Sequence, residues 1–184
     1  MSRTHVPPQP WRTLSHAIAY HRRIQVIEDL VGTPDGDEFV YVYMKSAHDV
    51  VATLAITDDH QAVLVREYRH PIGKIIFNLP SGSIPDGETP SQAARRELAE
   101  EAGYLAHTLT PLGRMVPFPG AVVGTIHLFL ARELHPTTPR LDTHEYIEVV
   151  PMAVDAVLQR TLRGEFEDGA LQLAVLRAAQ QGLL

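Results

Sequence analysis

The feature that most constrains the fold is a segment whose helix has a marked beginning and end. Thr89 can cap a helix that begins at Pro90, because proline fits the first helical turn and a threonine oxygen accepts from its free N–H groups. Gln92, three residues after Thr89, completes a capping box. Gly103 can adopt the left-handed conformation that ends a helix. The sequence therefore predicts a helix over residues 90–102.

Three acidic side chains gather on one face of this helix. Glu97, Glu100 and Glu101 are spaced i, i+3 and i+4, which brings them together and destabilises an isolated helix. Carboxylate oxygens suit magnesium or manganese rather than zinc, and magnesium takes further ligands from substrate phosphates. The pattern therefore indicates a metal site; the alternative is a solvated charged face.

Strand patterns dominate the first half of the chain and helices come later. Strands are predicted, in order, over residues 24–30, 39–44, 50–56, 61–65, 75–79, 122–131 and 146–150, the first four as two hairpins. Further helices are predicted over residues 152–160 and 169–179. This order favours an α+β fold over a doubly wound parallel sheet.

The N-terminal segment differs in charge from the rest. Residues 1–27 carry four arginines and no acid, whereas the whole chain has a net charge of −6. Such a stretch could help to hold an anionic ligand, or it could be a solvated tail. Three prolines among the first ten residues predict an extended arm. We expect an arm and hairpin over residues 1–45, able to form a dimer, and a main domain over residues 46–184.

Composition excludes several classes of protein. The absence of cysteine removes disulfides, thiolate zinc sites and cysteine nucleophiles. A negative net charge and a pI of about 5.9 argue against a nucleic-acid partner. We find neither an apolar run long enough to cross a bilayer nor an apolar leader. The expectation is a cytoplasmic protein that binds neither nucleic acid nor membrane.

The acidic helix and the loop before it resemble the Nudix box, which reads Gly, five residues, Glu, seven residues, then Arg-Glu-apolar-any-Glu-Glu-any-Gly-apolar. Its fixed positions are filled by Gly82, Glu88, Arg96, Glu97, Glu100, Glu101 and Gly103, with Leu98 and Tyr104 at the apolar ones. The resemblance implies a Nudix-type α/β/α sandwich, a mixed sheet with helices on both sides. It also implies hydrolysis of a nucleoside diphosphate linked to another group, and a structural ion pair between Glu88 and Arg96.

The resemblance also implies the metal site. Glu97 and Glu101 would be the chief ligands of two or three Mg²⁺ or Mn²⁺ ions, with Glu100 beside them. A backbone carbonyl at Ser81 or Gly82 would complete the ligand set. Glu100 and Glu101 would thereby take part in catalysis.

Residues on the N-terminal side of the box add substrate candidates. Residues 65–71 and 78–82 resemble the ADP-ribose pyrophosphatase subgroup, although Glu67 stands where that subgroup often has Gln. Arg69 is the best candidate for a phosphate contact, because a guanidinium can hold two oxygens, and Arg66 is its neighbour.

The other end of the substrate would be an adenosine. A proline 16 residues after Gly103 marks the same subgroup, so Phe118 and Pro119 would line the pocket. Trp11 and Tyr20 are candidate adenine platforms, although Tyr20 could equally pack in the core. Relatives often form homodimers by exchanging N-terminal strands, and we expect a homodimer here.

The general base in this subgroup is often a glutamate on a mobile loop after the box. Glu145 precedes the strand predicted over residues 146–150 and is preferred on loop mobility. Glu148 lies within that strand and is the alternative, as the base, a further metal ligand or a solvent-facing residue.

The expected reaction is metal-dependent hydrolysis of ADP-ribose or a related nucleotide sugar to AMP and ribose 5-phosphate. Two alternatives stay open. One is a Nudix hydrolase of a nucleoside triphosphate, a dinucleoside polyphosphate or coenzyme A, because the box fixes the bond that is cut but not the leaving group. The other is a module that binds a nucleotide sugar without cleaving it.

Overall fold

The computed structural model describes residues 9–22 and 24–184, and their contacts form two compact units. The first unit contains the N-terminal residues up to Ala47 together with Phe118–Val123. The second contains His48–Pro117 and Gly124–Leu184. Within the described residues, no helix has the length and apolar character needed to cross a membrane.

The first unit is a sheet in the order β1–β2–β3–β9. Its strands are β1 (Arg12–His21), β2 (Ile24–Gly32), β3 (Glu38–Ser46) and β9 (Val122–Val123). The predicted hairpin of β2 and β3 is confirmed. The sequence pattern does not predict β1, whose pairing with β2 is interrupted by two register shifts. Most of the predicted extended arm lies outside the described residues.

The second unit is a mixed sheet in the order β11–β5–β4–β10–β8, with β6 paired to β5 and β7 paired to β4. Only β10 and β4 run parallel among these pairs. The strands are β4 (Val50–Ile56), β5 (Gln61–Arg69), β6 (Lys74–Asn78), β7 (Ser81–Ser83), β8 (Tyr104–Met115), β10 (Ile126–Pro136) and β11 (Ile147–Ala153). A short 3₁₀ turn, η1 (His70–Ile72), joins β5 to β6.

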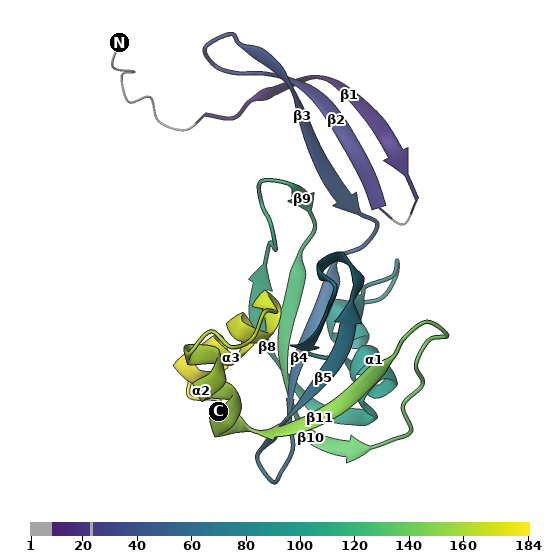
Figure 1. The fold of residues 1–184 in the computed structure, drawn as a ribbon, viewed down its shortest axis with the longest axis vertical. Helices are drawn as coiled ribbons and strands as arrows, with labels where there is room; N and C mark the ends of the chain where they lie inside the picture. Colours follow the sequence, from purple (N-terminus) through teal and green to yellow (C-terminus); the bar gives the residue numbers. More distant parts are fainter. Residues whose placement is uncertain (1–8, 23) are drawn as a thin grey trace. The chain divides into compact units, whose positions relative to one another are not determined.

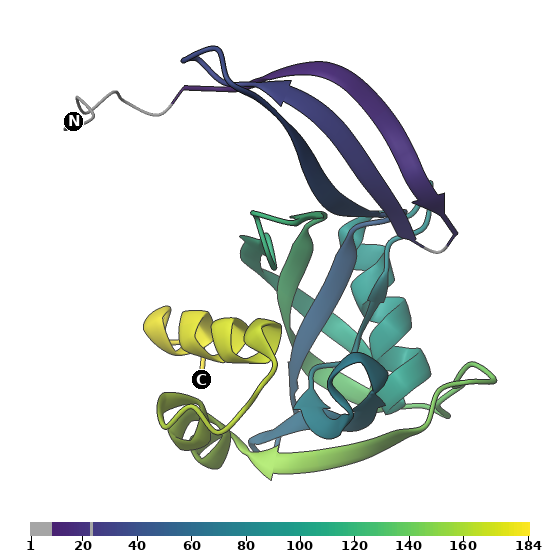
Figure 2. The same ribbon diagram turned by 45° about the horizontal axis from the view of Figure 1, so that its top comes forward.

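Helices cover both faces of this second sheet. Helix α1 (Pro90–Ala102) lies on one face, and helices α2 (Val154–Leu162) and α3 (Gly169–Gln180) lie on the other (Figures 1 and 2). The α+β sandwich expected from the sequence is therefore confirmed.

Alternate residues of β5 identify the two faces. Leu64 belongs to the apolar layer that contains Leu171 of α3, whereas Val63 belongs to the layer that contains Leu98 of α1. Because side chains alternate along a strand, the odd-numbered residues of β5 face α1 and the even-numbered ones face α2 and α3. The odd or even number of a polar residue on β5 therefore indicates whether it lies on the side of the acidic helix.

Helix α1 begins and ends where the sequence predicts. The Gln92 backbone N–H donates to the Thr89 hydroxyl, and the Thr89 N–H donates to the Gln92 side chain at 2.9 Å, so the capping box is present. Gly103 ends the helix with φ 71°, in the left-handed region. These local contacts fix the rotation of α1 about its axis, and thus the direction in which its acids point.

The single strand predicted over residues 122–131 is wrong. The structure has two strands, β9 in the first unit and β10 in the second, with a break at Gly124 and Thr125. The break is held by Asp49, whose carboxylate accepts from the Thr125 N–H at 2.8 Å. Smaller differences are that α2 begins at Val154, because β11 continues to Ala153, and that β8 is not predicted. The pairing of β8 with β10 shifts register between Pro111 and Gly113.

Candidate active site

The acidic face of α1 lies against the short strand β7, and Gly82 makes this approach possible. A Cβ atom placed on Gly82 would overlap the carboxylate of Glu97. Any larger residue would therefore push Glu97 away from the sheet. Glycine is thus required at position 82 because the Glu97 side chain, 15 residues later, occupies the space that a Cβ atom would need.

Glu101 is the most deeply buried acid of the helix. Its side chain lies on the sheet side of α1, the residue is 7% exposed, and its carboxylate accepts from the Ser81 N–H at 2.8 Å. Burial raises the pKa of Glu101 to about 8; the Ser81 hydrogen bond opposes this, and the charges of Glu97, Glu145 and Glu67 add to it. Glu101 is therefore a buried carboxyl group whose charged form is disfavoured by its surroundings and would be favoured by nearby positive charge.

Arg96 supplies positive charge to the other acids. Its Nη1 donates to Glu97 at 2.6 Å and to Glu100 at 3.0 Å. Its Nη2 donates to Glu88 at 2.9 Å, which confirms the predicted ion pair between the loop and the helix. These bonds raise the pKa of Arg96 further, so the guanidinium stays charged. Burial nevertheless raises the pKa of Glu97, against the opposing effect of Arg96.

The resemblance of the acidic segment to the Nudix box implies a divalent metal ion, and the carboxylate donors here fit one. Among the described residues, no three acidic or histidine side chains are arranged as a preformed metal cluster. Arg96 engages oxygens of Glu97 and Glu100, whereas Glu101 contacts only a backbone N–H. Burial and the neighbouring acids raise the pKa of Glu101, and a hard cation with carboxylate ligands would oppose both effects.

Glu145 and Glu148 differ in the side of the sheet that they approach. The charge of Glu145 raises the pKa of both Glu97 and Glu101, so its carboxylate lies within electrostatic reach of the acidic face. It also accepts from the Asp142 N–H at 2.9 Å, which holds it in the loop before β11.

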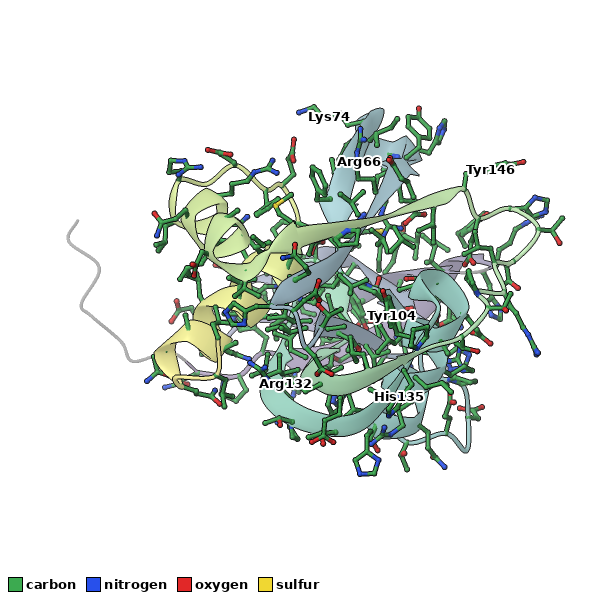
Figure 3. The ribbon with its side chains drawn as sticks, turned by 90° about the horizontal axis from the view of Figure 1, so that it is seen from below. Arg66, Lys74, Tyr104, Arg132, His135 and Tyr146 are labelled. Carbon is green, nitrogen blue, oxygen red and sulfur yellow. The ribbon has the colours of Figure 1, made fainter. Side chains whose placement is uncertain are left out.

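Glu148 pairs with Arg66 at 3.0 Å, directly across β11 and β5. Arg66 lies over the Phe77 ring at 5.5 Å, in the layer under α2 and α3. Figure 3 shows Tyr146 pointing away from the domain. The structure thus brings Glu145 toward the acids of α1, but not Arg66 or Glu148.

Arg69 ends β5 with the parity of the α1 side and is held by Glu67, and its charge also acts on Asp168, the N-cap of α3. Its Nη1 contacts the Glu67 carboxylate at 2.9 Å. Glu67 was not predicted as a site residue, although its charge acts on Glu101. The sequence marks Glu67 only in one way: it stands where the ADP-ribose pyrophosphatase subgroup often has Gln.

A pocket of about 250 Å³ lies beside Glu100, between α1 and the loop after β10. The Arg140 N–H fixes this loop by donating to the Glu100 carbonyl at 2.9 Å. The pocket is lined by charged, hydroxyl and apolar side chains: Arg96, Ala99, Glu100, Leu105, Thr137, Thr138 and Arg140.

Four predicted substrate residues belong to the first unit. Trp11 packs edge-on against Phe39, with ring centroids 5.1 Å apart. Tyr20 is paired with Val26 on the opposite face of that sheet, so Trp11 and Tyr20 of one chain do not form a common platform.

The other two predicted residues, Phe118 and Pro119, lie in the segment Phe118–Val123, which belongs to the first unit. Phe118 is 63% exposed, and Pro119 lines a pocket of about 210 Å³ with Tyr41 and Tyr43. The Tyr41 hydroxyl donates to the Gly120 carbonyl at 2.6 Å, which holds the loop on the sheet. The roles of Phe118 and Pro119 in binding substrate stay predictions.

The NUDIX domain family model matches residues 46–173, so the chain belongs to the Nudix family. Its similarity to named members is substantial. It is 34% identical over 137 residues to the ADP-ribose pyrophosphatase of Bacillus subtilis, which covers 71% of this chain and 74% of that protein. It is 33% identical over 127 residues to the methanol dehydrogenase activator of Bacillus methanolicus, covering 68% and 69%.

A solved structure shows the same fold. The crystal structure of an ADP compounds hydrolase superposes with a TM-score of 0.84 at 24% identity, covering 98% of this chain and all of the other. At this identity the likeness concerns the fold alone.

We predict that Gly82→Ala removes activity while the protein stays folded. The added methyl group displaces the Glu97 carboxylate, and a misplacement of about 1 Å at a catalytic group costs on the order of 100-fold in rate. The measurement is kcat/KM for the best phosphoanhydride substrate, with circular dichroism as the check on folding. Gly169→Ala is the matched control, because nothing lies within 4 Å of a Cβ there. Full activity of Gly82→Ala would contradict the role of this close approach.

Proposed function

We propose that this protein hydrolyses the pyrophosphate bond of ADP-ribose or a related nucleotide sugar to AMP and ribose 5-phosphate. The observation that carries the proposal is the complete set of acids on α1, packed against β7 with Glu101 buried, in a Nudix domain. The substrate class is supported by the similarity to an ADP-ribose pyrophosphatase over about 70% of both chains.

Glu97, Glu100, Glu101 and the Ser81 carbonyl would hold two to three Mg²⁺ or Mn²⁺ ions. When bound, such ions neutralise the phosphate oxygens and lower the pKa of water. The buried position of Glu101 and the hydrogen bond that it accepts from the Ser81 N–H support this ligand set. Arg96 then keeps the orientation of Glu97 and Glu100 through its bonds to both.

The remaining steps belong to side chains around the acids. Arg69 holds oxygens of the pyrophosphate, and Glu145 accepts a proton from the attacking water. The water oxygen forms a bond to one phosphorus, the P–O bond to the bridging oxygen breaks, and the second phosphate leaves. Trp11, Phe118 and Pro119 are the candidates for contact with the adenosine. The cytoplasmic location expected from the sequence stays a prediction.

We predict that Glu101→Gln lowers kcat for ADP-ribose with magnesium by about 100- to 1,000-fold. The amide keeps the shape of the side chain but removes a charge that a cation needs, and metal stabilisation of the transition state amounts to several kcal/mol. The assay measures AMP by chromatography. Glu165→Gln is the control, because Glu165 is an exposed partner of Arg160 and Arg163. Undiminished turnover by Glu101→Gln would refute the assignment.

We predict that Glu145→Gln lowers kcat by about 100- to 10,000-fold, the usual contribution of a general base. Glu148→Gln should change kcat by less than about threefold, because Glu148 is paired with Arg66 on the other face of the sheet. Steady-state kinetics of the two variants decides between them. A larger loss in Glu148→Gln than in Glu145→Gln would reverse the assignment of the base.

We also propose that the chain forms a homodimer through the first unit. One face of its sheet exposes Tyr20, Ile24, Val40, Val42 and Met44, each at least 40% exposed. Exposed apolar patches of this kind mark interaction surfaces. A twofold axis would cover the patch with the same patch of a second copy.

We predict that the purified protein has about twice the chain mass of 20.4 kDa in light scattering, and that Val42→Lys shifts it to the monomer mass. A buried lysine would remain unpaired in the interface, which is costly. Ile75→Lys, at an exposed apolar residue of the second unit, should leave the mass unchanged. A monomeric wild type would exclude the dimer.

A further inference from the structure

We infer that Glu67 is a positioning residue, which holds the guanidinium of Arg69 on the acidic side of the sheet so that it can receive the pyrophosphate. This inference rests on the proposed function, because it takes Arg69 as a phosphate contact. The sequence motif marks neither the pair nor Glu67.

The first support is the rigidity of Glu67. At this point β5 is paired on both sides, with Ile76 of β6 opposite Glu67 on one edge and Ile147 of β11 on the other. Arg69 is at the end of β5 and is paired only with Lys74 of β6. An ion pair between them therefore ties a side chain at a strand end to a backbone that is fixed on both edges.

The second support is burial. The Glu67 side chain is 22% exposed and that of Arg69 40%, and the Glu67 carboxylate contacts Arg69 Nη1 at 2.9 Å. Ion pairs between fully exposed side chains contribute little, but partial burial reduces screening by solvent. The pair can therefore hold one rotamer of Arg69.

The third support is the place of the pair beside the acids. Glu67 has the α1-side parity of β5 and its charge reaches Glu101, and Arg69 contacts the Glu67 carboxylate. Asp168, the N-cap of α3, is a second carboxylate within reach of the Arg69 charge. Its Oδ1 already accepts from the Leu171 N–H at 2.7 Å, so Glu67 is the carboxylate that Arg69 contacts.

The geometry leaves the arginine able to bind an anion. The contact uses Nη1, while a guanidinium carries five N–H donors in one plane. Nε and Nη2 can then meet two phosphate oxygens while Nη1 keeps its bond to Glu67. Glu67 thus reduces the ordering that Arg69 must undergo when substrate binds, which affects KM more than kcat.

A double-mutant cycle tests this inference, with Glu67→Gln, Arg69→Gln and the double variant assayed on ADP-ribose with magnesium. We expect Glu67→Gln to raise KM about tenfold and to change kcat less than about threefold. In the Arg69→Gln background the same change should alter kcat/KM less than about twofold, because the residue on which Glu67 acts is gone. Glu165→Gln is the matched control for loss of an ion-paired carboxylate.

Two further measurements separate other roles of Glu67. Calorimetric titration with Mn²⁺ should give the same affinity for wild type and Glu67→Gln within about threefold, and a tenfold weakening would make Glu67 a metal ligand instead. Equal losses in both backgrounds, or a loss in kcat rather than KM, would also overturn the inference.

Failure of the proposed function is seen separately, as a wild type that does not cleave ADP-ribose. The same cycle is then measured as the binding of inorganic pyrophosphate in calorimetry. There, coupling between Glu67 and Arg69 supports the positioning role, and additivity refutes it.

Discussion

The structure of the site depends on one close approach, that of helix α1 to the backbone of β7. Gly82 leaves room for the Glu97 carboxylate, and the Ser81 N–H receives the carboxylate of Glu101. Two acids one helical turn apart are thereby held against consecutive residues of one short strand. Their charges are costly to bury, as the raised pKa of Glu101 shows. The fold therefore places acids where they are least stable alone and most responsive to a cation.

Arg96 shows how the fold limits this cost. It joins Glu88 of the preceding loop to Glu97 and Glu100 of the helix, so one guanidinium serves three carboxylates. A buried charge without a partner destabilises a protein far more than a partnered one. Glu101 receives no such cation and has only a backbone N–H. The partnered acids are thus held in one orientation by Arg96, whereas Glu101 lies in surroundings that would favour a divalent ion.

Local contacts explain why part of this could be predicted from the sequence. The helix, its capping box and its final glycine depend on residues within a few positions of one another, and the structure has them where predicted. The break between β9 and β10 could not be read in the same way, because it depends on Asp49, far away in the sequence, binding the Thr125 N–H. The same holds for β1, whose register with β2 shifts twice. Whether Trp11 and Tyr20 share a face was likewise a question of register, and they do not.

The alternation of side chains along β5 can be read from the sequence, but which face lies toward α1 is known only from the packing. Alternation along β5 separates Arg66 from Glu67 and Arg69, whichever face is which. The assignment of the faces comes from Val63 packing with Leu98 of α1, and Leu64 with Leu171 of α3. Arg66 then pairs with Glu148 away from the acids, whereas Arg69 is held by Glu67 beside them. Two arginines three residues apart thus have different roles, because an odd step along a strand changes the face and an even step keeps it.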